Sequence, residues 1–368
     1  MPPMDGDSGL LGFLRGGRGP GHPSLQHGRN AAGHGRLFEY VNGPLDSPWG
    51  RRRAANGHPA PYNLRHLQLG NEERVDETYF RKFSALAEAI WAKDTNIILV
   101  VGDFAYSAPI ADPFQFTGAA SGITTLAAHQ KILHLAKSRG REVWFDVHVG
   151  TDGPRPDGTL SGMFSFRDAL GRIANGAQHK VVVFELNAQN HTQRRALANA
   201  LALNAIERDG RIPVVTSANC LQPDGQNDNG WDQGLLFFNP AQVWLQPPGW
   251  VSRMVARHYQ PWAVPVEVAG ANDILDASAK CSEDGRTLVL QVVNLSGRPQ
   301  PAALHLRGSS PRSDTAGVED LAAPLDARNT AQHPDQVVPK ASRCRHRLVT
   351  GVAQYTFAPC SFTVLTFQ

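Results

Sequence analysis

The feature that most restricts the fold is a regular alternation of apolar, strand-like runs and amphipathic, helix-like stretches between residues 67 and 260. Apolar strands that alternate with helices are typical of parallel sheets, whose faces the helices cover. The strand-like runs are residues 67–69, 97–101, 143–148, 180–187 and 213–217, and the helical stretches are residues 80–91, 122–138, 166–174, 197–205 and 251–259. Five such units are too few to close an eight-stranded barrel, so they predict a partial one.

The pattern changes at about residue 263, beyond which helical periodicity disappears. Apolar or alternating runs separated by turn residues follow, which predicts antiparallel strands. These runs are residues 288–293, 302–306, 352–357 and 362–367. We therefore predict an α/β domain over residues 37–262 and an all-β, antiparallel β-sandwich over residues 263–368. Residues 1–36 are rich in Gly, Arg and His without apolar periodicity, which predicts a disordered segment.

Composition disfavours several classes of protein. A net charge of +3 over 368 residues, without a recognition motif, does not indicate a nucleic-acid partner. No apolar run reaches the roughly 18 residues of a membrane-spanning helix. The first residues lack the apolar stretch of an export signal, so the cytoplasm is the default expectation, with a secreted longer parent left open. The four cysteines lack metal-site spacing, and one disulfide among Cys281, Cys344 and Cys360 stays open.

Two glutamates, Glu72 and Glu185, stand where predicted strands end. The run that precedes Glu72 stops at Gly70, where the chain can turn and present Asn71 and Glu72. The carboxyl ends of parallel strands form the reactive rim of barrel enzymes, so both glutamates are candidates for one active site. Glycoside hydrolysis needs such a pair, one carboxylic acid to protonate the leaving oxygen and one carboxylate to attack the sugar or activate water.

Neighbouring residues leave alternatives open. Glu73 is a second candidate for the acid, but adjacent side chains at a strand end point apart, and we favour Glu72. Asp103 and Asp146 also follow strands, and hydrogen bonding to loop amides is the simpler role for both. For His148 the choices are orienting a carboxylate, binding a sugar hydroxyl, or no role beyond that of a loop histidine.

Three tryptophans, Trp144, Trp231 and Trp244, offer flat apolar faces for sugar rings, although core packing is the commoner role of Trp. We keep Trp144 and Trp231 as substrate-binding candidates with Asn71 and His148. The sequence contains no Gly-rich phosphate loop, metal-ligand cluster or Gly-x-Ser-x-Gly motif. We therefore expect neither a metal nor a cofactor.

Several motifs together resemble the family 51 α-L-arabinofuranosidases, from about residue 37 to the C-terminus. The resemblance is carried by residues 39–44, 47–50, 56–59, 69–72, 101–103, 184–187 and 288–294. It implies a retaining glycosidase whose barrel has its acid/base at the end of the fourth strand and its nucleophile at the end of the seventh. The present chain would then contain about strands 4 to 8.

On this resemblance Glu72 is the acid/base, Asn71 binds the sugar 2-hydroxyl and Glu185 is the nucleophile. The implied substrates are the terminal arabinofuranosyl groups of arabinan, arabinoxylan or oligosaccharides. Residues 1–36 stand in place of the family's first three barrel strands, and residues 184–187 lack the tryptophan often found there. An open sheet exposes its edges, so we also expect self-association or a homo-oligomer.

The leading hypothesis is thus a retaining α-L-arabinofuranosidase. Its alternative is a catalytically impaired carbohydrate-binding remnant of such an enzyme, and a structural interaction protein ranks third. Turnover indicates the enzyme, binding without turnover indicates the remnant, and the absence of both indicates the structural protein.

Overall fold

The computed structural model describes residues 31–153, 155–225, 232–270, 273–308, 311–346 and 352–368. By its internal contacts the chain divides into two compact units. The first unit is Met1–His148 with Ser161–Val182, and the second is Val149–Leu160 with Val183–Gln368. Within the described residues, no helix is long and apolar enough to cross a membrane.

The first unit combines helices with three parallel strands, which pair in the order β1, β2, β3. Its elements are α1 (Ala31–Asn42), α2 (Pro48–Ala55), β1 (His66–Leu69), α3 (Glu77–Trp91), β2 (Ile98–Gly102), α4 (Ala127–Ser138) and β3 (Val143–Gly150), followed by α5 (Asp157–Ile173). Helix α1 begins at Ala31, so residues 31–36 belong to a helix and not to the predicted disordered segment. The rest of that segment, residues 1–30, lies outside the described residues.

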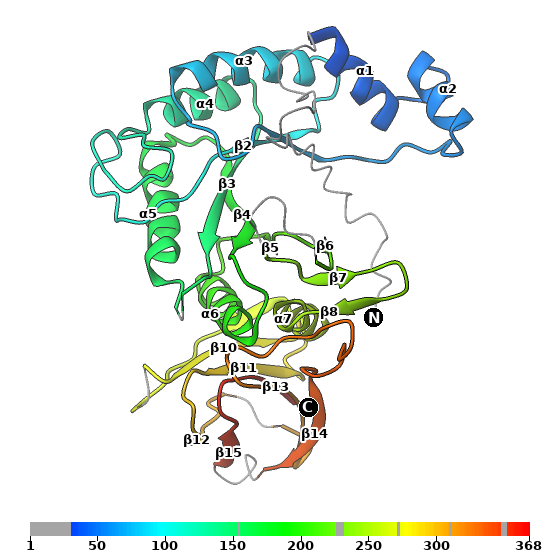
Figure 1. The fold of residues 1–368 in the computed structure, drawn as a ribbon. Coiled ribbons are helices and arrows are strands. Elements are labelled where there is room, and N and C mark those ends of the chain that lie inside the picture. The colour runs from blue at the N-terminus through cyan, green and yellow to red at the C-terminus, as the bar shows by residue number, and fades with distance from the viewer. Residues whose placement is uncertain (1–30, 154, 226–231, 271–272, 309–310, 347–351) are drawn as a thin grey trace. The chain divides into compact units, whose positions relative to one another are not determined.

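Helix α3 shows how the local sequence defines an element. Asp76 caps its N-terminus, and the carboxylate accepts hydrogen bonds from the amides of Thr78 and Tyr79. Its buried face includes Phe83 and Ile90, at the spacing of an amphipathic helix. Helix α4 lies beside α3 (Figure 1).

The second unit contains the end of the parallel sheet and all of the antiparallel strands. Its elements are β4 (His179–Asn187), α6 (Gln193–Asp209), β5 (Val215–Ser217), β6 (Leu221–Pro223), β7 (Leu236–Phe238), β8 (Val243–Leu245), α7 (Pro247–Arg257), β9 (Trp262–Val264), β10 (Leu275–Cys281), β11 (Leu288–Asn294), β12 (Gln300–Leu304), β13 (Thr315–Ala322), β14 (Lys340–Arg345), β15 (Ala353–Phe357) and β16 (Ser361–Phe367). A six-stranded sheet has the order β14-β13-β16-β11-β10-β9, and β12 pairs with β15.

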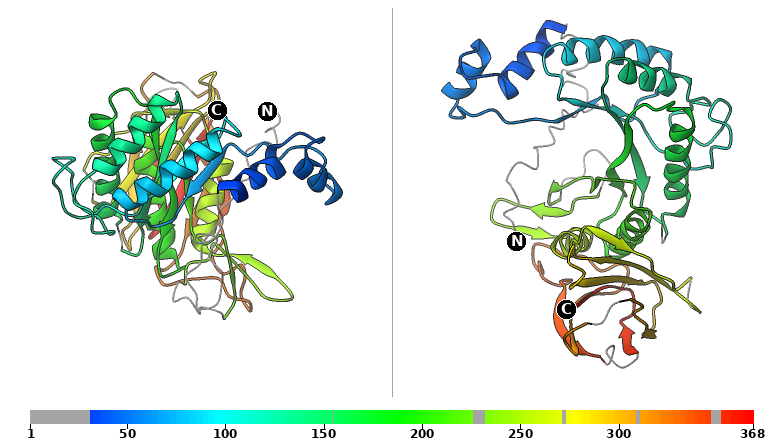
Figure 2. Two further views of the ribbon diagram at one scale, coloured as in Figure 1. Left: turned by 90° about the horizontal axis from the view of Figure 1, so that it is seen from above. Right: turned by 180° about the vertical axis from the view of Figure 1, so that it is seen from behind.

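Apolar clusters cover both faces of the central strands of the six-stranded sheet. On one face, Val293 and Phe362 pack against Leu197 of α6 and Met254 of α7. On the other face, a second apolar cluster includes Phe357 of β15. Figure 2 shows the sheet and the neighbouring helices α6 and α7 from two further sides. Small side chains such as those of Ala196 and Ala200, both fully buried, allow α6 to pack closely.

The parallel strands form one five-stranded sheet in the order β1-β2-β3-β4-β5. This order and the antiparallel sheets confirm the predicted partial barrel and C-terminal β-sandwich. Two predictions were less accurate: α5 begins at Asp157, and β6 to β10, β13 and β14 were not among the predicted strands. All four cysteines are free, so the disulfide left open among the last three is not formed.

Candidate active site

A tight backbone turn presents Asn71 and Glu72 beyond the end of β1. Gly70 has φ of +87°, which favours glycine. Gly102, at the end of β2, packs so closely on this turn that a Cβ added to it would lie 2.3 Å from the carbonyl oxygen of Gly70. The amide of Glu73 donates to the carbonyl oxygen of Gly102 at 2.9 Å. The turn is thus fixed to the neighbouring strand by a close contact and a hydrogen bond.

Glu72 itself has a left-handed backbone, with φ of +53°. For a residue other than glycine such a conformation costs about 1–3 kcal/mol and persists only where the surroundings impose it. Its side chain is 38% exposed. A strained, accessible carboxylate at the carboxyl end of a parallel strand is a typical active-site feature.

His148 holds the Glu72 carboxylate. Its Nδ1 atom lies 3.2 Å from Glu72 Oε1, and its Nε2 atom lies 3.3 Å from Asp146 Oδ2. Its side chain is 2% exposed, and the edge of the Phe104 ring packs against it with the ring centroids 5.8 Å apart. A neutral imidazole has only one N–H. Both contacts are therefore hydrogen bonds only if the imidazole is charged or one carboxyl keeps its proton.

The remaining acidic candidates of the first unit differ in environment. Asp103 is fully buried and accepts hydrogen bonds from the amide of Phe104, the hydroxyl of Tyr106 and Nε2 of His129, at 2.7–2.9 Å. This supports a structural role. Glu73 is half-buried.

Trp144 does not lie at this turn. Trp144 is 7% exposed, donates from Nε1 to Glu142 Oε1 at 2.6 Å, and packs on the ring of His66, the first residue of β1. His148 lies four residues further along β3, about 13 Å away at roughly 3.3 Å per residue. The position of Trp144 therefore favours packing over sugar binding near Glu72. Trp231 lies outside the described residues, and Trp244 is buried in the core.

Glu185 belongs to the second unit, near the end of β4. Its side chain is 5% exposed, and Asn187 Nδ2 donates to its Oε2 atom at 2.9 Å. Residues two apart on a strand share a face, which brings these two side chains together. The carbonyl oxygen of Asn187 in turn accepts from the amide and hydroxyl of Thr151. The carboxylate is thus buried and oriented by a neighbouring amide.

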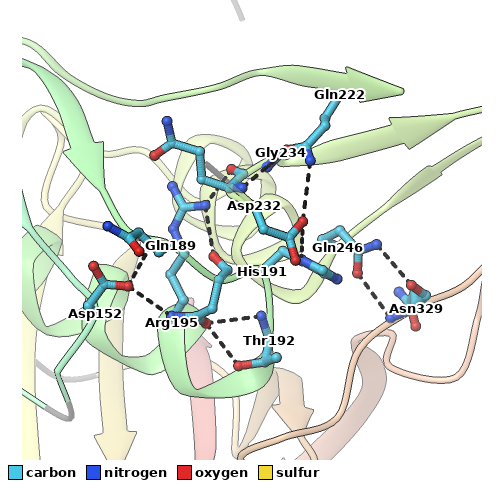
Figure 3. Close-up of polar contacts among 12 residues, drawn as sticks. Asp152, Gln189, His191, Thr192, Arg195, Gln222, Asp232, Gly234, Gln246 and Asn329 are labelled. Atoms are coloured by element: carbon cyan, nitrogen blue, oxygen red, sulfur yellow. Dashed lines mark hydrogen bonds and ion pairs between the residues drawn. The ribbon is translucent and has the colours of Figure 1, made fainter. Parts of the chain in front are cut away.

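Arg195 of α6 is a buried residue that the sequence patterns did not reveal. Its guanidinium, labelled in Figure 3, donates to four backbone carbonyl oxygens, one in β4 and three in the loops that follow β4, β5 and β6. The acceptors are Leu186 at 3.1 Å, Ala218 at 2.6 Å, Asn190 at 3.2 Å and Gln233. Burial lowers the pKa of Arg195 to about 10, although the charges of two carboxylates oppose this shift.

The segment 232–234 is held by a second set of polar contacts. Gln222 Oε1 accepts from the amides of Gln233 and Gly234 at 3.1 and 2.8 Å. Asp232 Oδ1 lies 3.1 Å from Nδ1 of His191, and Figure 3 shows the two side chains pointing toward each other. Burial lowers the pKa of His191 despite this carboxylate. These contacts join the segment to the loop after β4.

Models of two domain families match the chain. The alpha-L-arabinofuranosidase 1 domain matches residues 29–130, and the alpha-L-arabinofuranosidase C-terminal domain matches residues 176–361. The second match alone covers half of the chain. The chain belongs to the family 51 α-L-arabinofuranosidases.

Curated members of this family align with the chain over part of their length. α-L-Arabinofuranosidase A of Aspergillus niger is 24% identical over 279 residues, which are 74% of this chain and 39% of that protein. α-L-Arabinofuranosidase 2 of Arabidopsis thaliana is 22% identical over 312 residues, 83% of this chain and 41% of that protein. An extracellular exo-α-L-arabinofuranosidase of Streptomyces chartreusis is 44% identical over 64 residues, 17% of this chain and 8% of that protein. The chain spans less than half the length of these curated relatives.

Solved structures of family members share the fold. The family 51 enzyme of Thermotoga petrophila RKU-1 superposes with a TM-score of 0.67 at 18% identity, covering 94% of this chain and 74% of that one. The arabinose complex of the Thermotoga maritima α-L-arabinofuranosidase gives the same TM-score, covering 93% of this chain and 74% of that one.

Proposed function

We propose that this chain releases terminal α-L-arabinofuranosyl groups from arabinan, arabinoxylan or arabino-oligosaccharides with retention of configuration. The observation that carries the proposal is Glu72, an accessible carboxylate on a strained turn at the end of β1, in contact with buried His148. The Aspergillus niger and Arabidopsis thaliana relatives are named for arabinofuranosidase activity.

In the proposed mechanism one glutamate is the nucleophile and the other is the acid/base. Glu185 attacks the anomeric carbon while Glu72 donates its proton to the glycosidic oxygen, so that the C–O bond breaks and the leaving group departs as an alcohol. Glu72 then takes a proton from water, whose oxygen displaces Glu185 and releases arabinose. Such a double displacement needs carboxyl groups about 5–5.5 Å apart.

Two further residues complete the proposed site. We assign Asn71 to the sugar 2-hydroxyl because it adjoins Glu72 on the same turn. His148 orients the Glu72 carboxylate, and through its second nitrogen it couples that carboxylate to buried Asp146. No role is assigned to Trp144.

Carboxamide variants assayed on aryl α-L-arabinofuranosides test the assignment. E185Q removes the nucleophile and should lower kcat at least about a thousandfold. E72Q should lose about 10²–10⁴-fold on a substrate with a poor leaving group. It should lose far less in the first step on a dinitrophenyl glycoside, whose departure needs no acid. E73Q is the matched control, one residue further along the chain, and should stay near wild type.

Other outcomes separate the alternatives. Wild-type turnover by E185Q contradicts the proposal. Binding of arabino-oligosaccharides in calorimetric titration, without turnover by the wild-type chain, identifies a carbohydrate-binding remnant instead. A folded chain that shows neither binding nor turnover points to a structural role.

We also propose that the isolated chain self-associates. Strands β1 and β5 are the edges of the parallel sheet, and edge strands with unpaired backbone groups recruit other strands. Sedimentation velocity should show species larger than the monomer, and a monodisperse monomer contradicts this expectation.

A further inference from the structure

We propose that Arg195 is a positioning residue for Glu185, because its guanidinium fixes the irregular end of β4 that carries this carboxylate. The inference rests on the proposed function, in which Glu185 is the nucleophile, and adds a residue of α6 to the groups on which that nucleophile depends.

The pairing of β4 with β5 is irregular at Glu185. Val183 pairs with Val215, whereas Leu186 pairs with Ser217, so that three steps along β4 face two steps along β5. An extra residue of this kind is a β-bulge, which interrupts the hydrogen-bond ladder and redirects side chains. Glu185 lies within the irregular stretch, so the direction of its carboxylate depends on how the bulge is held.

Side chains hold the peptides on both sides of Glu185. Ahead of it, the carbonyl oxygen of Phe184 accepts from the hydroxyl of Thr216 at 2.6 Å. After it, the carbonyl oxygen of Leu186 accepts from Nη2 of Arg195 at 3.1 Å. The same nitrogen donates to the carbonyl oxygen of Ala218, just beyond β5, at 2.6 Å. Arg195 therefore bridges the ends of the two strands at the point where their backbone pairing is interrupted.

The second terminal nitrogen of the guanidinium binds two further backbone segments. Nη1 donates to the carbonyl oxygens of Asn190, in the loop after β4, and of Gln233. A guanidinium is planar, and its donors diverge at fixed angles, so four acceptors bound to it are held in one geometry. A lysine ammonium is a single point with three donors and cannot reproduce this arrangement.

Packing alone does not explain why a charged residue, Arg195, occupies this position. Arg195 is fully buried, and the acceptors described for it are all backbone carbonyl oxygens. An apolar side chain of similar volume would avoid the desolvation cost of a buried charge. What the guanidinium adds is a fixed backbone around Glu185. A displacement of 1 Å at a reacting group can lower the rate about a hundredfold.

The test uses the full chain and the variants R195M, R195K and T216V. T216V removes the hydrogen bond to Phe184 with little change of shape, so it probes the same bulge even if R195M fails to fold. One readout is the rate at which Glu185 is covalently labelled by an arabinofuranose-configured cyclitol epoxide, measured by mass spectrometry. The other is kcat and KM on dinitrophenyl α-L-arabinofuranoside, which needs no acid assistance.

Arg53 of α2 provides a matched control. It is also fully buried, and it donates to the carbonyl oxygens of Tyr40, Gly43, His58 and Pro59 at 2.8–3.1 Å. R53M therefore loses a comparable set of hydrogen bonds in the first unit. It should lower the Tm while the folded protein labels at the wild-type rate.

We expect R195M to lower both the labelling rate and kcat about a hundredfold, with KM nearly unchanged. R195K should recover part of the loss, and T216V should show a smaller loss of the same kind. Wild-type labelling and turnover by R195K and T216V would overturn the positioning role while leaving the proposed function intact. If wild-type Glu185 is not labelled, the proposed function fails, and the positioning role fails with it.

Discussion

A buried ion pair between α6 and β10 offers a quantitative test of the second unit. Lys280 Nζ lies 2.7 Å from Glu207 Oε1, and the two side chains are 5% and 24% exposed. The other oxygen, Glu207 Oε2, accepts from Gln291 Nε2 at 2.6 Å and from the Ser278 hydroxyl at 3.0 Å. K280M removes the cation and leaves the half-buried carboxylate with the neutral donors Gln291 and Ser278.

The expected loss follows from this geometry. Breaking a buried pair by removing one partner costs about 3–5 kcal/mol. Because Glu207 is 24% exposed, solvent screens part of this, and we expect about 3 kcal/mol. For a unit of about 200 residues, the unfolding entropy is about 0.4 kcal/mol/K, so the Tm should fall by about 7 °C.

A double-mutant cycle measured by thermal and urea unfolding isolates the pair. E207Q alone leaves Lys280 buried without its counter-charge and should cost a similar amount. K280M/E207Q removes both charges, so its loss should be smaller than the sum of the two single losses by a coupling of about 2–3 kcal/mol. R139M, which breaks the exposed pair between Arg139 and Glu88, is the surface control. The reasoning is refuted if each single variant lowers the free energy of unfolding by less than about 1 kcal/mol and the two losses are additive in the double variant.

Two other substitutions test the turn at Glu72 and the pH dependence. G102A places a Cβ 2.3 Å from the carbonyl oxygen of Gly70, so it should displace the turn and lower kcat on an aryl arabinofuranoside about a hundredfold. The control is G171A, whose Cβ meets open space on α5 and should raise the free energy of unfolding by about 0.5 kcal/mol. Equal activity of the two variants contradicts the packing argument. Burial raises the pKa of Asp320 above its ordinary value of 3.8, against the opposing effects of the Thr363 hydroxyl and of Lys340. A raised folded-state pKa means that Asp320 contributes stability below pH 3.8 that is lost as the pH rises through the folded value. D320N should therefore be more stable than wild type in urea at pH 7 and lose this advantage near pH 4, whereas a pH-independent difference would exclude this origin.

Local sequence patterns were sufficient for the main elements of the α/β region. Apolar runs and turn residues located β1 to β5, and Gly70 marked the turn that carries Asn71 and Glu72. They failed for strands whose environment is set by distant partners. β14 is an edge strand with an exposed, polar sequence, and β13 carries Asp320, which the Thr363 hydroxyl of β16 satisfies at 2.7 Å.

The sequence by itself determined the order of the elements, the fold class and the two glutamates at strand ends, because these depend on periodicity and turn residues within short segments. Only the tertiary structure decided what holds the glutamates. His148 contacts Glu72 across 76 residues of sequence, and Arg195 reaches Gln233 across 38. Such contacts leave no periodic trace, since one histidine or arginine serves equally well on a solvated surface. Their roles arise when folding removes water from these groups and leaves specific protein atoms as their partners.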